Sequence, residues 1–230
     1  MCVQACRGFE SHSLHPKLDS YLKEEKMGSK MQTGLLLIIG TVVSVIGWMA
    51  IYPGSPEPEA TVENVAALMA DPTLTKLGML MGFGGMIALF IGFLNISRKM
   101  AAGDGAGASY ANISAIMAMT MVVIMAIAIG VEWAVAEASN ATEGASLMLV
   151  SAATQTPFNL ASGLLLFLLG IGIILEKNFH IIIGGLAVVA GAFFLIGSVD
   201  ALKDIGGFIG WIGMMLVALA LGVQTLRAKN

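Results

Sequence analysis

The sequence predicts an all-α, polytopic membrane protein built as a bundle of six transmembrane helices. The chain of 230 residues is 57% hydrophobic and only 12% charged, whereas soluble domains carry about 25% charged residues. So few charges cannot cover a surface that faces water. Apolar stretches of about 20 residues, enough to cross a hydrocarbon core of about 30 Å as a helix, recur along the chain. The short alternating patterns of barrel strands are missing from the sequence.

Residues 31–230 are predicted to form one transmembrane domain. We expect helices at about 32–52, 74–97, 111–136, 157–175, 179–199 and 205–226. The first helix ends at Tyr52-Pro53-Gly54, because a proline followed by a glycine stops a helix. The third is the longest and is expected to tilt, and the fourth is the shortest that still spans the core.

The loop after the first helix is expected to contain a short amphipathic helix. Val62, Val65, Ala66 and Met69 recur at helical spacing, which is typical of a segment that lies on the membrane surface or caps the bundle. The loop before the fourth helix is a second candidate, around Leu147 to Val150.

Glycines spaced four residues apart indicate closely packed helices. Gly78 and Gly82 form such a pair in the second helix, and Gly206 and Gly210 form another in the sixth. Small residues at this spacing let two helix backbones approach closely in lipid. Besides the lipid bilayer, we therefore expect partner membrane subunits or self-association through glycine faces. A nucleic-acid partner is not expected, because the net charge is −3 and no basic tract exists.

Two similar stretches open the first and fourth helices. They are "TGLLLIIG" from Thr33 and "SGLLLFLLG" from Ser162. The two helices would run in opposite directions, as in an inverted repeat of three helices. Leucine-rich helices also resemble one another by composition, so both interpretations stay open.

The basic residues predict the orientation in the membrane. One side carries Lys30, Arg98, Lys99, Lys177, Arg227 and Lys229, and the other side carries Lys76 and Lys203. The positive-inside rule then places both termini in the cytoplasm. We expect a multi-pass protein of the cell membrane, the plasma membrane of a prokaryote.

Residues 1–30 are predicted to be a disordered leader that is not native before Met27. "GFES", from Gly8 to Ser11, is what one reading frame of a transfer-RNA T-arm encodes. Residues 2–15 thus resemble read-through from an upstream tRNA gene, caused by a misassigned start. On this interpretation translation begins near Met27 or Met31. A genuine cytoplasmic tail is the alternative.

The leader also holds the residues from which a metal site would be built. Cys2, Cys6, His12 and His15 resemble zinc-finger ligands, but the two pairs are too close together for the usual fold. Without the leader the chain has no cysteine and one histidine, His180. Haem, iron–sulfur and thiol chemistry then have no ligands. We predict no cofactor, no metal ligand and no catalytic residue.

Glu132 is the strongest single candidate for a functional residue. It lies inside the third predicted helix, and charges in membrane helices are costly and mark functional sites. Met117, Met121 and Met125 occupy the same arc of the helix, which favours the bundle interior. Glu132 is also about 6 Å from the helix end, a position that suits a structural residue in contact with water.

Other polar residues are predicted at the same end of the bundle. They are Gln155, Asn159, Lys76, Asp200 and Lys203. Together with Glu132 they predict a polar vestibule that faces the outside. A continuous ion path does not follow from the sequence, because the other half of the bundle has few polar residues.

The pattern resembles small six-helix integral membrane families of bacteria and archaea, which have an acidic residue late in the third helix and short loops. That resemblance implies no activity. Three functions are open. A non-enzymatic scaffold or accessory subunit is favoured, a small transporter or channel with a vestibule at Glu132 is the alternative, and an enzyme acting on lipid or quinone would need clusters of His, Asp and Glu.

Overall fold

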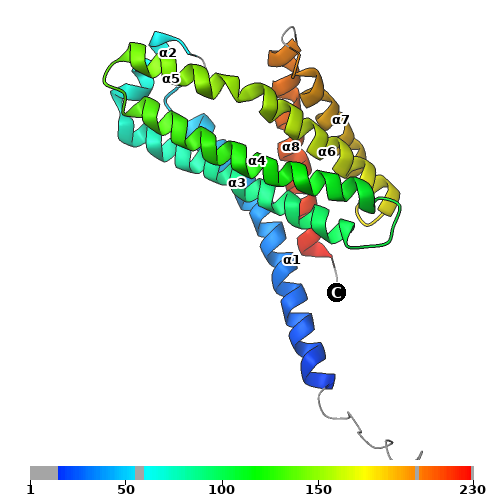
Figure 1. The fold of residues 1–230 in the computed structure, drawn as a ribbon. Coiled ribbons are helices and arrows are strands. Elements are labelled where there is room, and N and C mark those ends of the chain that lie inside the picture. Colours follow the sequence, from blue (N-terminus) through cyan, green and yellow to red (C-terminus); the bar gives the residue numbers. More distant parts are fainter. Residues whose placement is uncertain (1–14, 55–59, 200–201, 229–230) are drawn as a thin grey trace, which may run out of the picture.

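The computed structural model describes residues 15–54, 60–199 and 202–228 (Figure 1). These residues are mainly helical, and none of them forms a strand. The predicted all-α class is confirmed for these ranges. The elements are α1 His15–Ile46, the π-helical segment η1 Gly47–Ile51, α2 Val62–Ala70, α3 Pro72–Ala101, α4 Ala108–Ala136, α5 Ala141–Ala153, α6 Gln155–Glu176, α7 Ile181–Ile196 and α8 Lys203–Arg227.

Five helical segments in the described ranges are long and apolar enough to cross a membrane. They are Lys30–Ile51, Pro72–Ala101, Ala108–Ala136, Ala141–Glu176 and Ile205–Arg227. The predicted fifth span corresponds to α7, which is apolar but has only 16 residues. At 1.5 Å per residue it is about 24 Å long. The chain therefore has the helices of a multi-pass membrane protein, and the sixth crossing and the orientation stay predictions.

The first helix begins earlier than the sequence predicts. We expected a disordered leader over residues 1–30, but α1 starts at His15, so residues 15–30 are helical. Nine of its 16 residues are Lys, Leu, Glu or Met, which favour helices, and Pro16 lies in the first turn, where its missing N–H is not needed. The tRNA-like stretch from Gly8 to Ser11 lies outside the described residues, and a start near Met27 stays a prediction.

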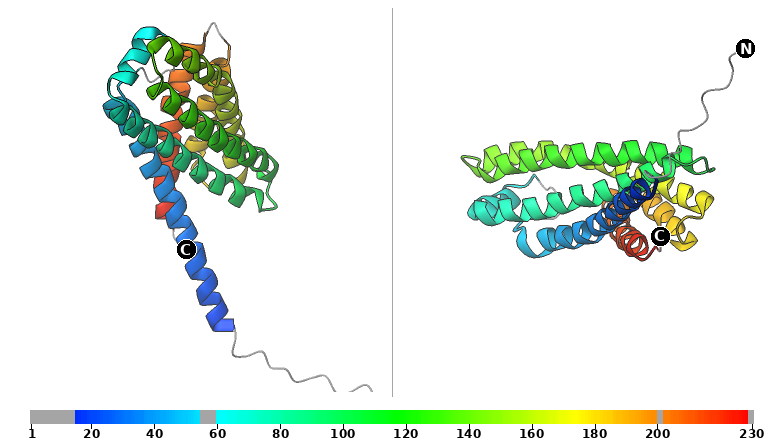
Figure 2. Two further views of the ribbon diagram at one scale, coloured as in Figure 1. Left: turned by 60° about the vertical axis from the view of Figure 1, so that its left-hand side comes forward. Right: turned by 90° about the horizontal axis from the view of Figure 1, so that it is seen from below.

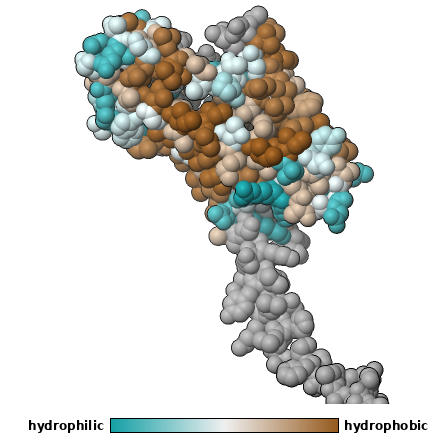
Figure 3. All heavy atoms as spheres, viewed as in Figure 1, coloured by the Kyte–Doolittle hydropathy of each residue, from teal (hydrophilic) through white to brown (hydrophobic). Residues whose placement is uncertain are grey.

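Six helices in the described part of the chain form a closed ring. The order around it is α1, α3, α4, α6, α7 and α8, and α8 packs back against α1 (Figures 1 and 2). Large apolar side chains that are less than 2% exposed contribute to the core, among them Phe90, Phe93, Met121, Leu166 and Phe194. The face seen in Figure 3 is mainly apolar across its middle and more polar towards two ends, as expected of a surface that contacts lipid.

Glycines allow neighbouring helices of the ring to touch through their backbones. A Cβ atom on Gly85 of α3 would lie 2.5 Å from the Ser44 nitrogen of α1. The two predicted glycine pairs have the same use, because a Cβ atom on Gly78, Gly82, Gly206 or Gly210 would collide with atoms of an adjacent helix of this chain or of the segment that follows α1. These four positions are therefore covered within the chain.

The end of the ring that contains Glu132 is capped by α2 and α5, and we call it the α2/α5 end. The amphipathic helix expected after the first span is confirmed as α2, in which Val65 and Leu68 are fully buried and Val62 is exposed. Thr61 caps α2 by accepting a hydrogen bond from the Asn64 N–H. The second expected helix is α5, which packs on α2 and leads directly into α6.

Candidate functional site

The carboxyl group of Glu132 is buried in α4 with both oxygens hydrogen-bonded. The side chain is 3% exposed. The Tyr52 hydroxyl donates to Oε2 at 2.9 Å, and the Ser151 hydroxyl donates to Oε1 at 2.9 Å. Tyr52 directly follows η1 and Ser151 belongs to α5, so a single carboxyl group joins three segments of the α2/α5 end.

Tyr52 owes its position to the π-helical end of the first membrane helix. Its N–H donates to the Gly47 carbonyl, five residues back, at 2.8 Å, and its backbone is extended ahead of Pro53, as residues before proline prefer. Gly78 of α3 makes room, because a Cβ atom there would lie 2.7 Å from the Tyr52 Cα. Trp48 packs edge-on against the Tyr52 ring, with 4.9 Å between ring centroids. Such π-helical turns are frequent at functional sites.

Lys76 binds a different carboxylate from the one at the site. Its Nζ donates to Glu137 Oε1 and lies 4.9 Å from the centre of the Trp133 ring. This hydrogen bond and the positive charge of Lys76 hold the pKa of Glu137 below its ordinary value. Among the side chains that the structure describes, no cation lies within ion-pair distance of Glu132.

Asn159 is buried but is not a partner of Glu132. Its amide donates to the Gly197 carbonyl at 2.9 Å and accepts from Gln155 Nε2 at 3.1 Å. It lies eight residues beyond Ser151 along nearly continuous helix, a distance of about 12 Å. Asn159 and Gln155 therefore hold α6 against the end of α7.

The remaining members of the predicted vestibule are not placed by the structure. Asp200 lies outside the described residues, and Lys203 begins α8 without a described side chain. Glu132 and Asn159 are 3% and 1% exposed, so both are enclosed by protein in this conformation. An open vestibule stays a prediction.

Further buried polar contacts follow the seam between α4 and α6 away from Glu132. Ser162 Oγ lies 3.5 Å from the sulfur of Met121. Ser114 Oγ donates to the Leu165 carbonyl at 3.1 Å and lies 3.1 Å from Ser97 Oγ. Met121 and Ser114 lie about 16 and 27 Å from Glu132 along α4, by the helical rise. The seam thus carries polar groups in both halves of the bundle.

Within the described ranges, no group of three or more His, Cys, Asp and Glu residues lies close enough to hold a metal ion. No family model, no curated protein and no solved structure matches the chain.

Proposed function

We propose that this chain moves protons across the membrane as a small transporter or channel, with Glu132 as its proton-binding group. The observation that carries the proposal is a buried carboxyl group whose described partners are two hydroxyls. Ionisable groups inside membrane bundles are costly, and they commonly belong to ion or proton pathways.

The partners of Glu132 suit a group that gains and loses a proton. A hydroxyl can donate to an ionised carboxylate and can also accept from a protonated one, so Tyr52 and Ser151 can serve both states. Tyr52 directly follows η1 and Ser151 lies in α5. A change in the protonation of Glu132 therefore alters hydrogen bonds to both segments at once. The α4–α6 seam places further polar groups between Glu132 and the opposite end of the bundle, at Ser162 and Ser114.

A scaffold or accessory subunit is the second candidate function. It is favoured by the large apolar side chains that fill the core of the ring and make it rigid. A rigid, filled bundle of this kind suits a protein that acts by packing against other membrane subunits.

The proposal includes six crossings with both termini in the cytoplasm. In its support, α7 packs between α6 and α8 in the ring, and Gly107, just before α4, donates its N–H to Glu176 at the end of α6. That contact puts the loops near Arg98 and Lys177 at one end of the bundle. The positive-inside rule assigns such an end to the cytoplasm.

Proton flux into liposomes tests the proposal. We expect the reconstituted wild-type protein to dissipate an imposed pH gradient faster than empty liposomes, and Glu132→Gln to abolish this excess while remaining folded. Glu137→Gln is the matched control, because it removes an exposed carboxylate five residues further along the chain. Equal flux in the wild type and Glu132→Gln would favour the scaffold.

A further inference from the structure

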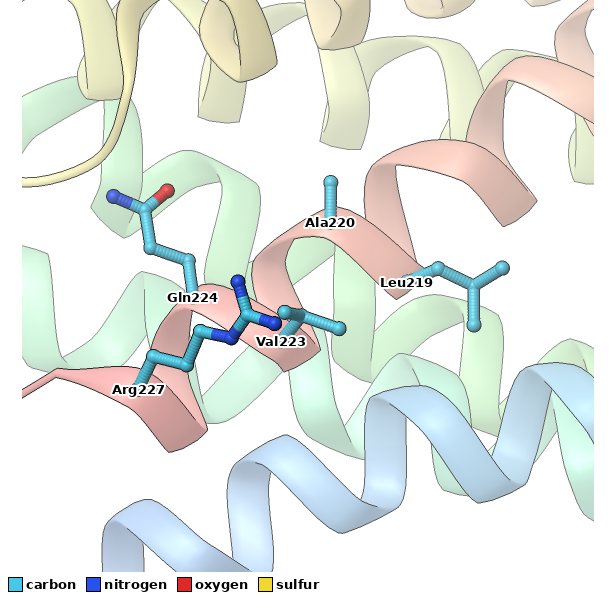
Figure 4. Close-up of a pocket in the computed structure, with 5 residues that line it drawn as sticks. All are labelled: Leu219, Ala220, Val223, Gln224 and Arg227. Atoms are coloured by element: carbon cyan, nitrogen blue, oxygen red, sulfur yellow. The ribbon is translucent and has the colours of Figure 1, made fainter.

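A groove of about 440 Å³ runs along the last turns of α8 (Figure 4). It is lined by Leu219, Ala220, Val223, Gln224 and Arg227. Residues four apart share one face of a helix, so Leu219, Val223 and Arg227 form one row and Ala220 and Gln224 form the next. The groove is apolar over its first part, and its polar side chains lie at the C-terminal end of the helix.

In the part of the chain that the structure describes, the neighbours of α8 leave this face uncovered. Helix α1 packs on another face, where Gly34 meets Leu226 and Gly222 meets Ile38. On the other side, the His180 N–H donates to Gln224 Oε1 at 3.2 Å, which places the start of α7 beside the groove. The groove therefore opens laterally, between α1 and the beginning of α7.

Arg227 gives the groove a positive end. No carboxylate lies within ion-pair distance of its guanidinium among the side chains that the structure describes. The candidate span Ile205–Arg227 ends at this residue, which puts its charge at the level expected for lipid headgroups. An apolar groove that ends in a cation at this depth matches the acyl chain and the phosphate of an anionic phospholipid.

We propose that this groove binds a phospholipid with a negatively charged headgroup. One acyl chain lies along Leu219, Ala220 and Val223, and the phosphate contacts Arg227 at the polar end beside Gln224. Leu219 and Arg227 are about 12 Å apart along the helix, so an extended acyl segment fits between them. Basic pockets beside membrane helices recognise anionic headgroups in this way. The inference does not depend on the function proposed for Glu132.

Titration with defined lipids tests the site. The full-length protein in detergent is titrated with phosphatidylglycerol or phosphatidylcholine of the same acyl chains, and bound lipid is counted by native mass spectrometry. We expect tighter binding of phosphatidylglycerol by the wild type. Arg227→Gln should weaken it by about fivefold, the effect of one basic residue near an anionic surface. Arg98→Gln removes an exposed charge outside the groove and should keep the preference.

A second variant keeps the test decisive if Arg227→Gln does not fold. Val223→Trp fills the groove, retains Arg227 and should reduce phosphatidylglycerol binding. Unchanged binding in Val223→Trp, or an equal loss of the preference in Arg98→Gln and Arg227→Gln, would overturn the site in favour of diffuse attraction. Inorganic phosphate should not compete with the lipid, and full competition by phosphate would overturn a lipid as the occupant.

Discussion

Replacing Glu132 by leucine is expected to lower the free energy of unfolding by about 1–3 kcal/mol. The substitution leaves the buried Tyr52 and Ser151 hydroxyls without their acceptor, and an unsatisfied buried group costs about 1–3 kcal/mol. Hydrogen bonds within membrane bundles contribute less, about 0.6 kcal/mol on average. The measured loss in the free energy of unfolding should therefore fall in the lower part of this range. Denaturation of the purified protein in detergent gives the value.

Glu132→Gln is the matched variant for this measurement. It keeps the shape of the side chain and a carbonyl oxygen that accepts a hydrogen bond, so it should unfold closer to the wild type than Glu132→Leu. Wild-type stability in Glu132→Leu would mean that the carboxyl group points into water. The hydrogen bonds that join α4 to Tyr52 after η1 and to Ser151 of α5 would then be absent.

Gly85→Ala is expected to destabilise the protein by about 1–3 kcal/mol, the usual cost of overpacking a close contact. The new Cβ atom would lie 2.5 Å from the Ser44 nitrogen and 2.6 Å from the Gly40 carbonyl oxygen, so α1 and α3 must separate. Backbone atoms cannot rotate away as a flexible side chain can. Thermal unfolding in detergent measures the loss.

The adjacent glycine provides the control. A Cβ atom on Gly84 would meet nothing within 4 Å, and alanine favours a helix over glycine by about 1 kcal/mol. Gly84→Ala should therefore unfold at the same temperature as the wild type or a higher one. Equal destabilisation by the two substitutions would show that the α1–α3 contact is looser than in the structure.

Much of the helical pattern could be predicted from the sequence, because long apolar runs with few charges leave little choice of fold in a membrane. The helix expected at 111–136 is α4, Ala108–Ala136, and the helix expected at 205–226 is α8. The start of the first helix was harder to place, because α1 begins at His15, inside the predicted leader.

The partners of Glu132 could not be predicted from local patterns. Tyr52 is 80 residues away in sequence and forms part of the predicted helix stop, and Ser151 directly follows the second predicted amphipathic segment, Leu147 to Val150. The methionine row favours the interior for Glu132 and its place near the helix end allows contact with water; in the structure Glu132 is buried. The contacts of Lys76 with Glu137 and of Asn159 with the Gly197 carbonyl depend on packing between helices that are distant in sequence.

Infrared difference spectroscopy tests most directly whether Glu132 binds and releases a proton. Spectra of the reconstituted protein at low and high pH should differ by the C=O band of a protonated, buried carboxyl group. This band should shift with isotope-labelled glutamate and should be missing in Glu132→Gln, whereas Glu137→Gln should retain it. Identical difference spectra for the wild type and Glu132→Gln would contradict the account, because Glu132 would then keep one protonation state throughout.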